Sequence, residues 1–515
     1  MPGDRRFVNR RAGSIAAPDR LPIVRAWWIS LLAVAAGIAV HQLGWQIEGP
    51  AVAILGFAPL MIAIDEDLMP GFFIGPATYM YLYHALGWAI GPVGQLHIAG
   101  WADFVEHGFS LSQWAVVIGL ATFSVVYPQA FRVIARWSNR HDVRSDESQS
   151  DWQRYTWLLL LVTLLVMGYG VYVGVGDRWL GSEMVFSAAQ QTIFSAFGYV
   201  EQALFFFLGY QVARRGQLWI GLWLAIIGGH AVYSLTQGGR GLLVTAAMAS
   251  AIGLALGGVS RRKIFLAGAF VAIPFVPLAA VVDVYRSGGS YGASGQGFGE
   301  RVTALGQASD DFWSDAVVQN LQSSEVFWRR VTADVADRVF ELTPSVIPHA
   351  GFDSIENVLW VFVPSVFAPG RPNLSDGNLA AIQYGAGAGE EGRLGFYMPT
   401  VGDAYRRFGW TGIPFFYAAA SAGTAVIAGF AWPRRRRKHW MAVLVLVTMQ
   451  ASWIMSATMI TMFWTLLWFF PKYVVFFWLL SMSQDRLWRA RSNGRSNLEA
   501  QGIAFRVSSL ARDRR

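Results

Sequence analysis

The sequence contains no cysteine, which excludes disulfide bonds, thiolate metal sites and a cysteine nucleophile. Charged residues are also scarce: they make up 14% of the chain, whereas soluble domains carry about 25%. Hydrophobic residues make up 54%, which is more apolar surface than a globular core absorbs. The low charge therefore excludes an ordinary soluble protein and indicates an integral membrane protein.

The familiar motifs of cofactor and metal chemistry are absent as well. The chain has no P-loop, zincin motif, nucleophile elbow or dinucleotide fingerprint. The glycine-rich run at 288–299 is followed by Glu300 instead of a Lys-Ser/Thr pair, and the eight histidines lack metal-ligand spacing. We therefore expect no cofactor and no metal site.

What the sequence has in abundance is long apolar runs. They predict an all-α polytopic membrane protein with about twelve spanning helices. The predicted windows are 22–42, 50–64, 70–92, 110–130, 155–175, 191–212, 217–235, 241–258, 263–283, 409–431, 440–458 and 461–482.

Basic residues between these windows predict the orientation of the chain. With the N-terminus in the cytoplasm, the arginine-rich short loops all fall on the cytoplasmic side, as the positive-inside rule requires. These basic stretches are 132–154, 213–216, 260–263, 434–438 and the tail from Arg486. The same distribution of short basic runs explains the net charge of +8 without a nucleic-acid partner. The sequence thus predicts N-in, C-in topology.

The predicted organisation alternates membrane parts with one large connection. Residues 1–21 form a cytoplasmic tail, and the run at 22–42 is long enough to be a retained first helix. About nine helices occupy 22–283, an extracytoplasmic loop occupies 284–408 between helices 9 and 10, and about three helices follow at 409–482, before the basic cytoplasmic tail 483–515. The large loop contains enough Trp, Phe, Val and Ile to fold as an ordered cap with short helices.

A lone arginine stands on a glycine hinge in "SLTQGGRGLL", residues 234–243. A charge deep in a bilayer costs roughly 2.5–3.5 kcal/mol on insertion scales and marks a functional site by default. Gly238, Gly239 and Gly241 allow close backbone approach, and a helix that starts beside Arg240 favours an anion at its N-terminus. One interpretation is a site for a lipid-linked diphosphate; the alternative is an arginine that reaches to the headgroups.

More arginines follow on the same predicted side. Arg371 stands in "APGRPNLSDGN", Arg393 in "EEGRLGFY", and Arg406 and Arg407 in "GDAYRRFGWTG" at the start of the tenth helix. Each of them alone fits a solvated loop with ordinary surface pairs. Together with Arg240 they favour one anion-binding site on the outer face.

Three segments carry a resemblance to a known family. "LTQGGRGLL", "VFVPSVFAPGRPNL" and "VGDAYRRFGWTGIPFFYAA" resemble, in this order along the chain, elements of the O-antigen and exopolysaccharide repeat-unit polymerases, the Wzy family. The number of helices and the large outer loop are also similar. The family's first hinge position is often serine, whereas Gln237 and Gly238 stand there in this chain.

The resemblance implies a metal-independent membrane glycosyltransferase, similar to C-class enzymes, in a bacterial cytoplasmic membrane. It would join polyprenyl-diphosphate-linked oligosaccharide units into a surface polysaccharide, an O-antigen or exopolysaccharide, on the outer side of that membrane. Its partners would be the lipid-linked oligosaccharide and the lipid bilayer. The resemblance also implies diphosphate binding by Gly238, Gly239, Arg240, Gly241, Arg371, Arg393, Arg406 and Arg407. Polysaccharide export or chain-length proteins would be partners.

The acceptor hydroxyl needs a general base. The candidates on the outer side are His349, Asp376, Glu390, Glu391 and Asp403. Asp403 is slightly favoured because it lies one helical turn before Arg406 and Arg407, and it fits equally well as their ion-pair partner or as a helix N-cap. His349 is the second choice.

Three other functions remain open at this point. An O-antigen ligase shares the arginine chemistry and the large loop. A flippase or another transporter would line a path with polar residues inside the membrane, where the sequence offers Glu201, His84 and Asp283. A non-catalytic component of an assembly complex would tolerate loss of Arg240 and Arg371.

Overall fold

We describe the fold from a computed structural model of the chain. The structure describes residues 23–72, 74–99, 106–140, 149–173, 199–236, 241–268, 281, 285, 298–315, 335–363, 380, 382–385, 398–456 and 458–486. Every regular element in these ranges is a helix, and none is a strand. The all-helical architecture expected from the apolar runs is therefore confirmed for the described part of the chain.

The helices of the N-terminal half are α1 (Ile23–Gln42), α2 (Glu48–Leu55), α3 (Ala58–Leu68), α4 (Pro76–Ala85), η2 (Leu86–Ile90), α5 (Gly91–Gly94), η3 (Gln95–Ala99), α6 (Glu106–Arg140), α7 (Gln149–Val173), α9 (Val200–Arg215), α10 (Gln217–Thr236) and α11 (Gly241–Leu256). The helices of the C-terminal half are α13 (Phe298–Asp315), α15 (Val335–Leu342), η4 (Ile355–Phe362), α17 (Thr400–Ala431), η5 (Trp432–Arg434), α18 (Lys438–Ser456), α19 (Met459–Trp464) and η6 (Thr465–Phe469). Every predicted apolar window contains helix in its described part.

Six helices of the described part are long and apolar enough to cross a membrane. They are Ile23–Gln42, Phe109–Arg140, Asp151–Tyr172, Gln217–Thr236, Thr400–Arg434 and Met459–Arg486. The other windows contain shorter or interrupted helices, as where α2 gives way to α3 at Gly56 and Phe57. The protein is thus a helical membrane protein, whereas its twelve spans and their orientation stay predictions.

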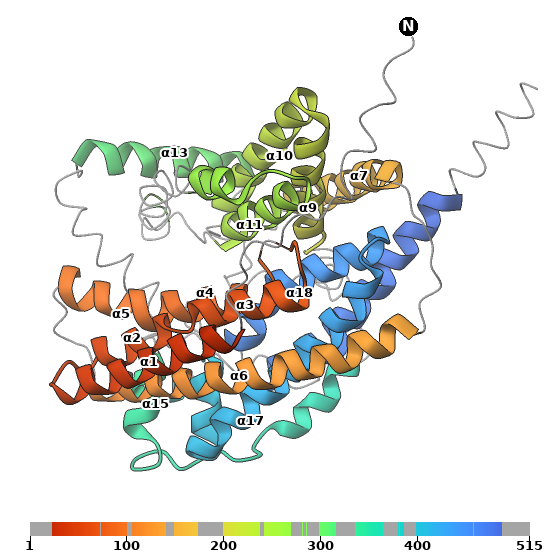
Figure 1. The fold of residues 1–515 in the computed structure, drawn as a ribbon. Helices are drawn as coiled ribbons and strands as arrows, with labels where there is room; N and C mark the ends of the chain where they lie inside the picture. The colour runs from red at the N-terminus through yellow and green to blue at the C-terminus, as the bar shows by residue number, and fades with distance from the viewer. Residues whose placement is uncertain are drawn as a thin grey trace, which may run out of the picture.

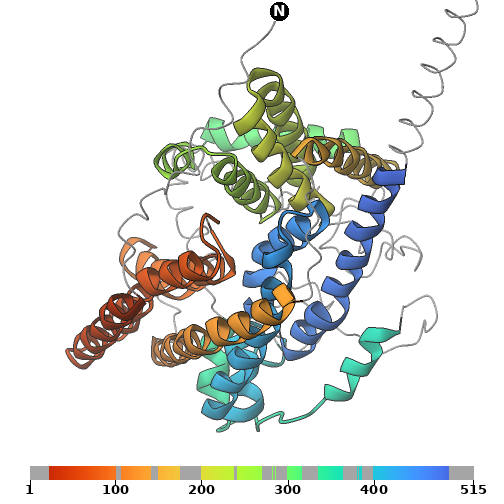
Figure 2. The same cartoon turned by 45° about the vertical axis from the view of Figure 1, so that its right-hand side comes forward.

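Helix α18 occupies the centre of the molecule. Its residues from Met441 to Gln450 are buried on every side, and a helix that is apolar all round belongs in an interior. In both views it lies between the red and orange helices α1–α5 and the green helices α9–α11 (Figures 1 and 2). The two groups of helices therefore share α18 as their core.

Helices α6 and α17 lie side by side along much of their length (Figure 1). Small residues allow this close packing: Gly119 of α6 faces the ring of Tyr417, and Gly429 of α17 lies against the backbone at Phe131. This pair of helices includes residues 400–407, the first two turns of α17.

A similar close approach joins α9 and α11. A Cβ atom on Gly253 would lie 2.0 Å from the carbonyl oxygen of Phe206, and one on Gly209 would lie 2.4 Å from that of Ser250. Only glycine fits at these two positions, so the helices pack backbone to backbone, as small residues allow in membranes.

The connections predicted to be cytoplasmic meet at one end of the molecule. Asp67, in the last turn of α3, pairs with Arg132 at 2.8 Å, and its neighbour Glu66 pairs with Arg261. At the same end, the indole of Trp152 donates to the Arg436 carbonyl at 3.3 Å, and Lys438 pairs with Asp485 at 2.7 Å. The guanidinium of Arg434 also donates to Ser138 of α6.

The opposite end gathers connections predicted to lie outside. Glu48 pairs with His97 at 2.7 Å, and the hydroxyl of Ser110 donates to the Gln46 carbonyl at 3.0 Å. The described parts of the long connection form helices α13, α15 and η4. Helix α17 begins at Thr400, whereas the sequence places the start of that span at residue 409.

Candidate functional site

The site is built on the first two turns of α17, residues 400–407, which a kink separates from the rest of the helix. Phe408 and Gly409 leave helical geometry there, and Gly409 has φ of +60°. The carbonyls of Arg406 and Arg407 accept hydrogen bonds from the N–H groups of Ala350 and Gly351, at 3.0 and 3.1 Å. Because residues 350 and 351 donate to these two carbonyls, the helix breaks at this point and restarts after Gly409.

Asp403 lies at the centre of this short segment and is fully buried. Its spacing of three and four residues to the two arginines places all three side chains on one helix face. Arg406 donates from Nε and Nη2 to Oδ1 at 3.0 and 2.6 Å, and the Nε of Arg407 lies 3.2 Å from both carboxylate oxygens. A backbone donor, the Met459 N–H at 2.8 Å, completes the shell and ties α17 to the start of α19. Asp403 is therefore an ion-pair partner, one of the roles that the sequence left open.

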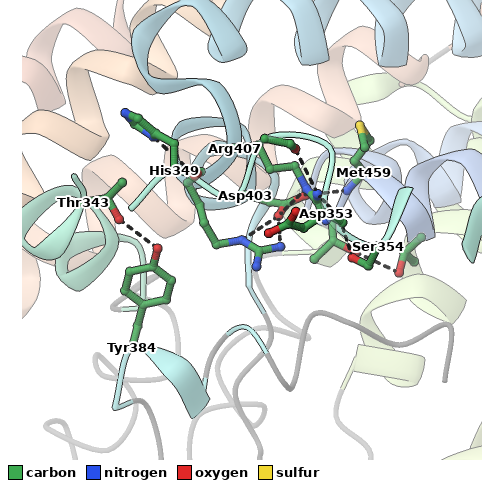
Figure 3. Close-up of polar contacts among 12 residues, drawn as sticks. Thr343, His349, Asp353, Ser354, Tyr384, Asp403, Arg407 and Met459 are labelled. Atoms are coloured by element: carbon green, nitrogen blue, oxygen red, sulfur yellow. Dashed lines mark hydrogen bonds and ion pairs between the residues drawn. The ribbon is translucent and has the colours of Figure 1, made fainter. Parts of the chain in front are cut away.

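Arg407 joins this helix to the segment 350–353 of the long connection. Its side chain is fully buried, and its Nη1 donates to the carbonyls of Gly351 at 3.2 Å and Asp353 at 2.7 Å (Figure 3). Together with the two backbone hydrogen bonds at Ala350 and Gly351, these contacts fix residues 350–353 against α17. The guanidinium of Arg407 therefore has a structural role, because it attaches residues 351–353 to α17.

His349 borders the same cluster and is exposed. Its Nδ1 lies 3.4 Å from the carbonyl oxygen of Arg406, and its ring meets the edge of Tyr405 with centroids 6.1 Å apart. A Cβ atom on Gly409 would lie 3.4 Å from its Cε1. The exposed histidine therefore lies next to the buried ion pairs (Figure 3).

A buried tyrosine and an aromatic stack line the neighbouring wall. The hydroxyls of Tyr384 and Thr343 are 2.8 Å apart, and burial raises the pKa of Tyr384 above its usual value. Phe340 stacks on Tyr405 with ring centroids 4.0 Å apart. Phe340 thus attaches α15 to α17, and Tyr384 is attached to the residue that follows α15.

The structure brings four of the predicted site residues together: Asp403, His349, Arg406 and Arg407. Gly241 is the first residue of α11. The other predicted ligands and bases lie outside the described residues: Gly238, Gly239, Arg240, Arg371, Arg393, Asp376, Glu390 and Glu391. Whether Arg240 joins this cluster stays a prediction.

Some of the partners in the site carry no sequence signal. The Met459 N–H and the carbonyls of Gly351 and Asp353 are backbone groups, which any residue could supply.

Inside the membrane helices, Lys472 is not among the predicted polar residues, although a single charge in the apolar run "FFPKYVVFF" is detectable from sequence. Its Nζ lies 5.6 and 5.1 Å from the rings of Phe469 and Tyr473.

The cluster suits an anion better than a metal. Two guanidinium groups face one carboxylate, so these three side chains carry a net positive charge. Within the described ranges, no three His, Asp or Glu side chains are close enough to hold a metal ion. Arginine forks bind carboxylate and phosphate groups through paired hydrogen bonds.

Comparisons with known proteins return no match: neither a protein-family model, nor a curated protein, nor a solved structure resembles this chain. Function must therefore be inferred from the residues themselves.

Proposed function

We propose that this protein is a membrane glycosyltransferase that polymerises polyprenyl-diphosphate-linked oligosaccharide repeat units into a surface polysaccharide. The observation that carries the proposal is the pair Arg406 and Arg407, which share the carboxylate of Asp403 at the end of a candidate membrane span. A lipid diphosphate presents its charge at this level of a bilayer, next to the water.

The two arginines take different parts in this proposal. Arg407 has no exposed side-chain surface and holds residues 351–353, so it positions the site. Arg406 keeps 9% of its side chain exposed, which lets its guanidinium approach a ligand. Arg406 would stabilise the diphosphate as negative charge develops on the leaving group.

His349 is the better general base in this arrangement. Asp403 already accepts hydrogen bonds from two arginines and from the Met459 N–H, so it would have to break ion pairs to take a proton. Within the described part of the chain, the exposed imidazole of His349 has no such ion pair, and it lies beside Arg406. Asp403 then acts as a positioning residue for both guanidinium groups.

The proposed step is a single displacement. The acceptor hydroxyl oxygen forms a bond to the anomeric carbon of the growing chain, and the bond from that carbon to the diphosphate oxygen breaks. The hydroxyl proton passes to His349, and the polyprenyl diphosphate leaves with the bonding electrons. No electron is gained or lost by the protein.

An O-antigen ligase would use the same step with a different acceptor.

A transporter is favoured by a separate observation inside the helix bundle. Glu201 of α9 and His230 of α10 are buried with Oε2 and Nδ1 3.7 Å apart, and Gln450 of α18 donates to Gln202 at 3.2 Å. Polar pairs at this depth line pathways in transporters. Polymer formed by purified protein in detergent micelles, which have no second compartment, would decide for the enzyme.

Binding of undecaprenyl diphosphate to the purified protein tests the arginine site directly. Loss of one charge-assisted hydrogen-bonding group costs about 1.5–3 kcal/mol, so Arg406→Ala should raise Kd roughly 10- to 100-fold. Arg262→Ala, an exposed arginine at the opposite end, is the matched control and should leave Kd unchanged. Equal binding by the two variants would contradict the proposal.

A further inference from the structure

The loop segment that packs against the arginine site exposes large apolar side chains. Val346 and Leu359 are each 71% exposed, Phe352 is 69% exposed and Trp360 is 38% exposed. They lie in and just before the short 3-10 helix η4, inside the long connection that the sequence places in water. Apolar surface gathered in this way marks an interaction site.

Helix η4 has one face towards the protein and another away from it. A 3-10 helix has about three residues per turn, so residues three apart share a face. Ile355 and Val358 are half-buried, and Ile355 packs against the main core. Glu356 and Leu359 share another face and are both exposed. The outward face thus changes from a carboxylate to leucine within one turn.

The contacts of this segment fix its level relative to the candidate spans. Its start is tied to α17 through Arg407 and Asp353, and η4 packs against α19. Figure 2 shows η4 alongside the last helix. That helix, Met459–Arg486, has 28 residues, which at about 1.5 Å per residue exceeds a hydrocarbon core of about 30 Å. Its first turns, where η4 packs, therefore lie at the boundary between headgroups and acyl chains.

The neighbouring spans expose apolar side chains at the same place. The ring of Phe352 contacts Phe408 at the kink, with centroids 5.0 Å apart. Just beyond the kink, Trp410 and Phe415 of α17 are 41% and 61% exposed. The exposed surface of the loop segment therefore continues the outward surface of a candidate membrane helix.

We infer that residues 352–360 lie in the bilayer interface rather than in water, with lipid as their partner. Phe352, Leu359 and Trp360 contact acyl chains, and Glu356 stays at the headgroups, since it precedes Leu359 by one turn. The membrane then holds the loop whose carbonyls bind Arg407. This inference needs only the membrane setting and is independent of the proposed function.

Site-directed spin labelling tests the inference, and the lack of native cysteine makes each single-cysteine variant label at one position only. Leu359→Cys, Glu356→Cys and Ser345→Cys are labelled in the full chain reconstituted in phosphatidylcholine–phosphatidylglycerol nanodiscs. Collision with oxygen, which concentrates in acyl chains, is compared with collision with a water-soluble nickel chelate. The three positions are exposed, so the substitutions leave the packing intact.

The expected order of the oxygen-to-nickel ratio is 359 above 356 and 356 above 345, with oxygen prevailing at 359. A second label, bimane attached to the Leu359→Cys variant, should be quenched by lipids brominated on their acyl chains. Nickel accessibility at 359 equal to that at 345 would overturn the inference. Protection of 359 from both reagents would overturn it as well, because protein would then cover this face.

Discussion

At the scale of single residues, Asp403 has the largest predicted effect on stability. It forms ion pairs with two buried guanidinium groups, so Asp403→Asn removes the carboxylate that both of them share. Breaking a buried ion pair by removing one partner costs about 3–5 kcal/mol. We expect Asp403→Asn to lower the thermal unfolding temperature in detergent markedly.

The control is Asp67→Asn, which removes the partner of Arg132 at the other end of the molecule. The side chains of Arg132 and Asp67 are 45% and 42% exposed, and exposed pairs contribute about 0–1 kcal/mol. Equal unfolding temperatures for the two variants would refute the buried-network account of Asp403.

His84 illustrates a histidine that is satisfied structurally. It is fully buried, its Nδ1 lies 3.0 Å from the Met80 carbonyl oxygen, and its Nε2 lies 2.8 Å from the hydroxyl of Tyr417. Tyr417→Phe removes the hydrogen-bond partner of the His84 Nε2. This loss should lower the free energy of unfolding by about 1–3 kcal/mol. Chemical unfolding in detergent measures the loss, and Tyr172→Phe, at an 88% exposed tyrosine, should show none.

The sequence predicts part of the site and misses the rest for a physical reason. Helical periodicity alone places Asp403 beside Arg406 and Arg407, and the structure has all three in contact. The Met459 N–H and the Asp353 carbonyl are contributed by residues far along the chain, and backbone groups leave no mark on composition. Only packing brings them to the carboxylate and the guanidinium.

At the scale of elements, close helix packing gives the sharpest prediction. Gly253→Ala would place a Cβ atom 2.0 Å from the Phe206 carbonyl oxygen, so α11 must move away from α9. Overpacking of this kind costs about 1–3 kcal/mol. Thermal unfolding measures it against Gly228→Ala in α10, where no atom lies within 4 Å and alanine should gain up to about 1 kcal/mol. Destabilisation by Gly228→Ala alone would contradict this packing.

Apolar runs predict where helices form, but they do not predict how helices break. The window 50–64 contains two helices, α2 and α3, instead of one. Similarly, α17 begins at Thr400 and is interrupted after Arg407. The interruption comes from backbone N–H groups of residues 350 and 351, which bind the carbonyls of Arg406 and Arg407, and not from the apolar pattern. Hydropathy indicates which residues contact lipid, so it gives little information about helical residues that do not contact lipid.

At the scale of the whole molecule, several of the basic connections meet at one end of the described structure. Arg132, Arg261 and Lys438 meet acidic partners from distant segments at one end. The sequence predicts these connections on one side from charge alone, and the contacts give a structural reason why the acidic turn at 65–67 accompanies them.

Orientation is tested by labelling with a membrane-impermeant maleimide. Ser345→Cys should react in intact cells with an accessible periplasm, because the long connection is predicted outside. Arg262→Cys, in a basic connection, should react only after the membrane is permeabilised. Both substitutions are at exposed positions, and the unsubstituted chain has no cysteine to react. The reverse pattern would invert the topology and place the arginine site in the cytoplasm.

The central claim is that the cluster around Asp403 catalyses polymerisation of lipid-linked glycan. Its most direct test is a reconstitution of purified protein with a polyprenyl-diphosphate-linked repeat unit, followed by gel separation of the products. The account predicts a ladder of chains with the unchanged protein and with Arg262→Ala, and no ladder with Arg406→Ala or His349→Ala. A normal ladder from Arg406→Ala, or none from the unchanged protein in the presence of the substrate, would contradict it.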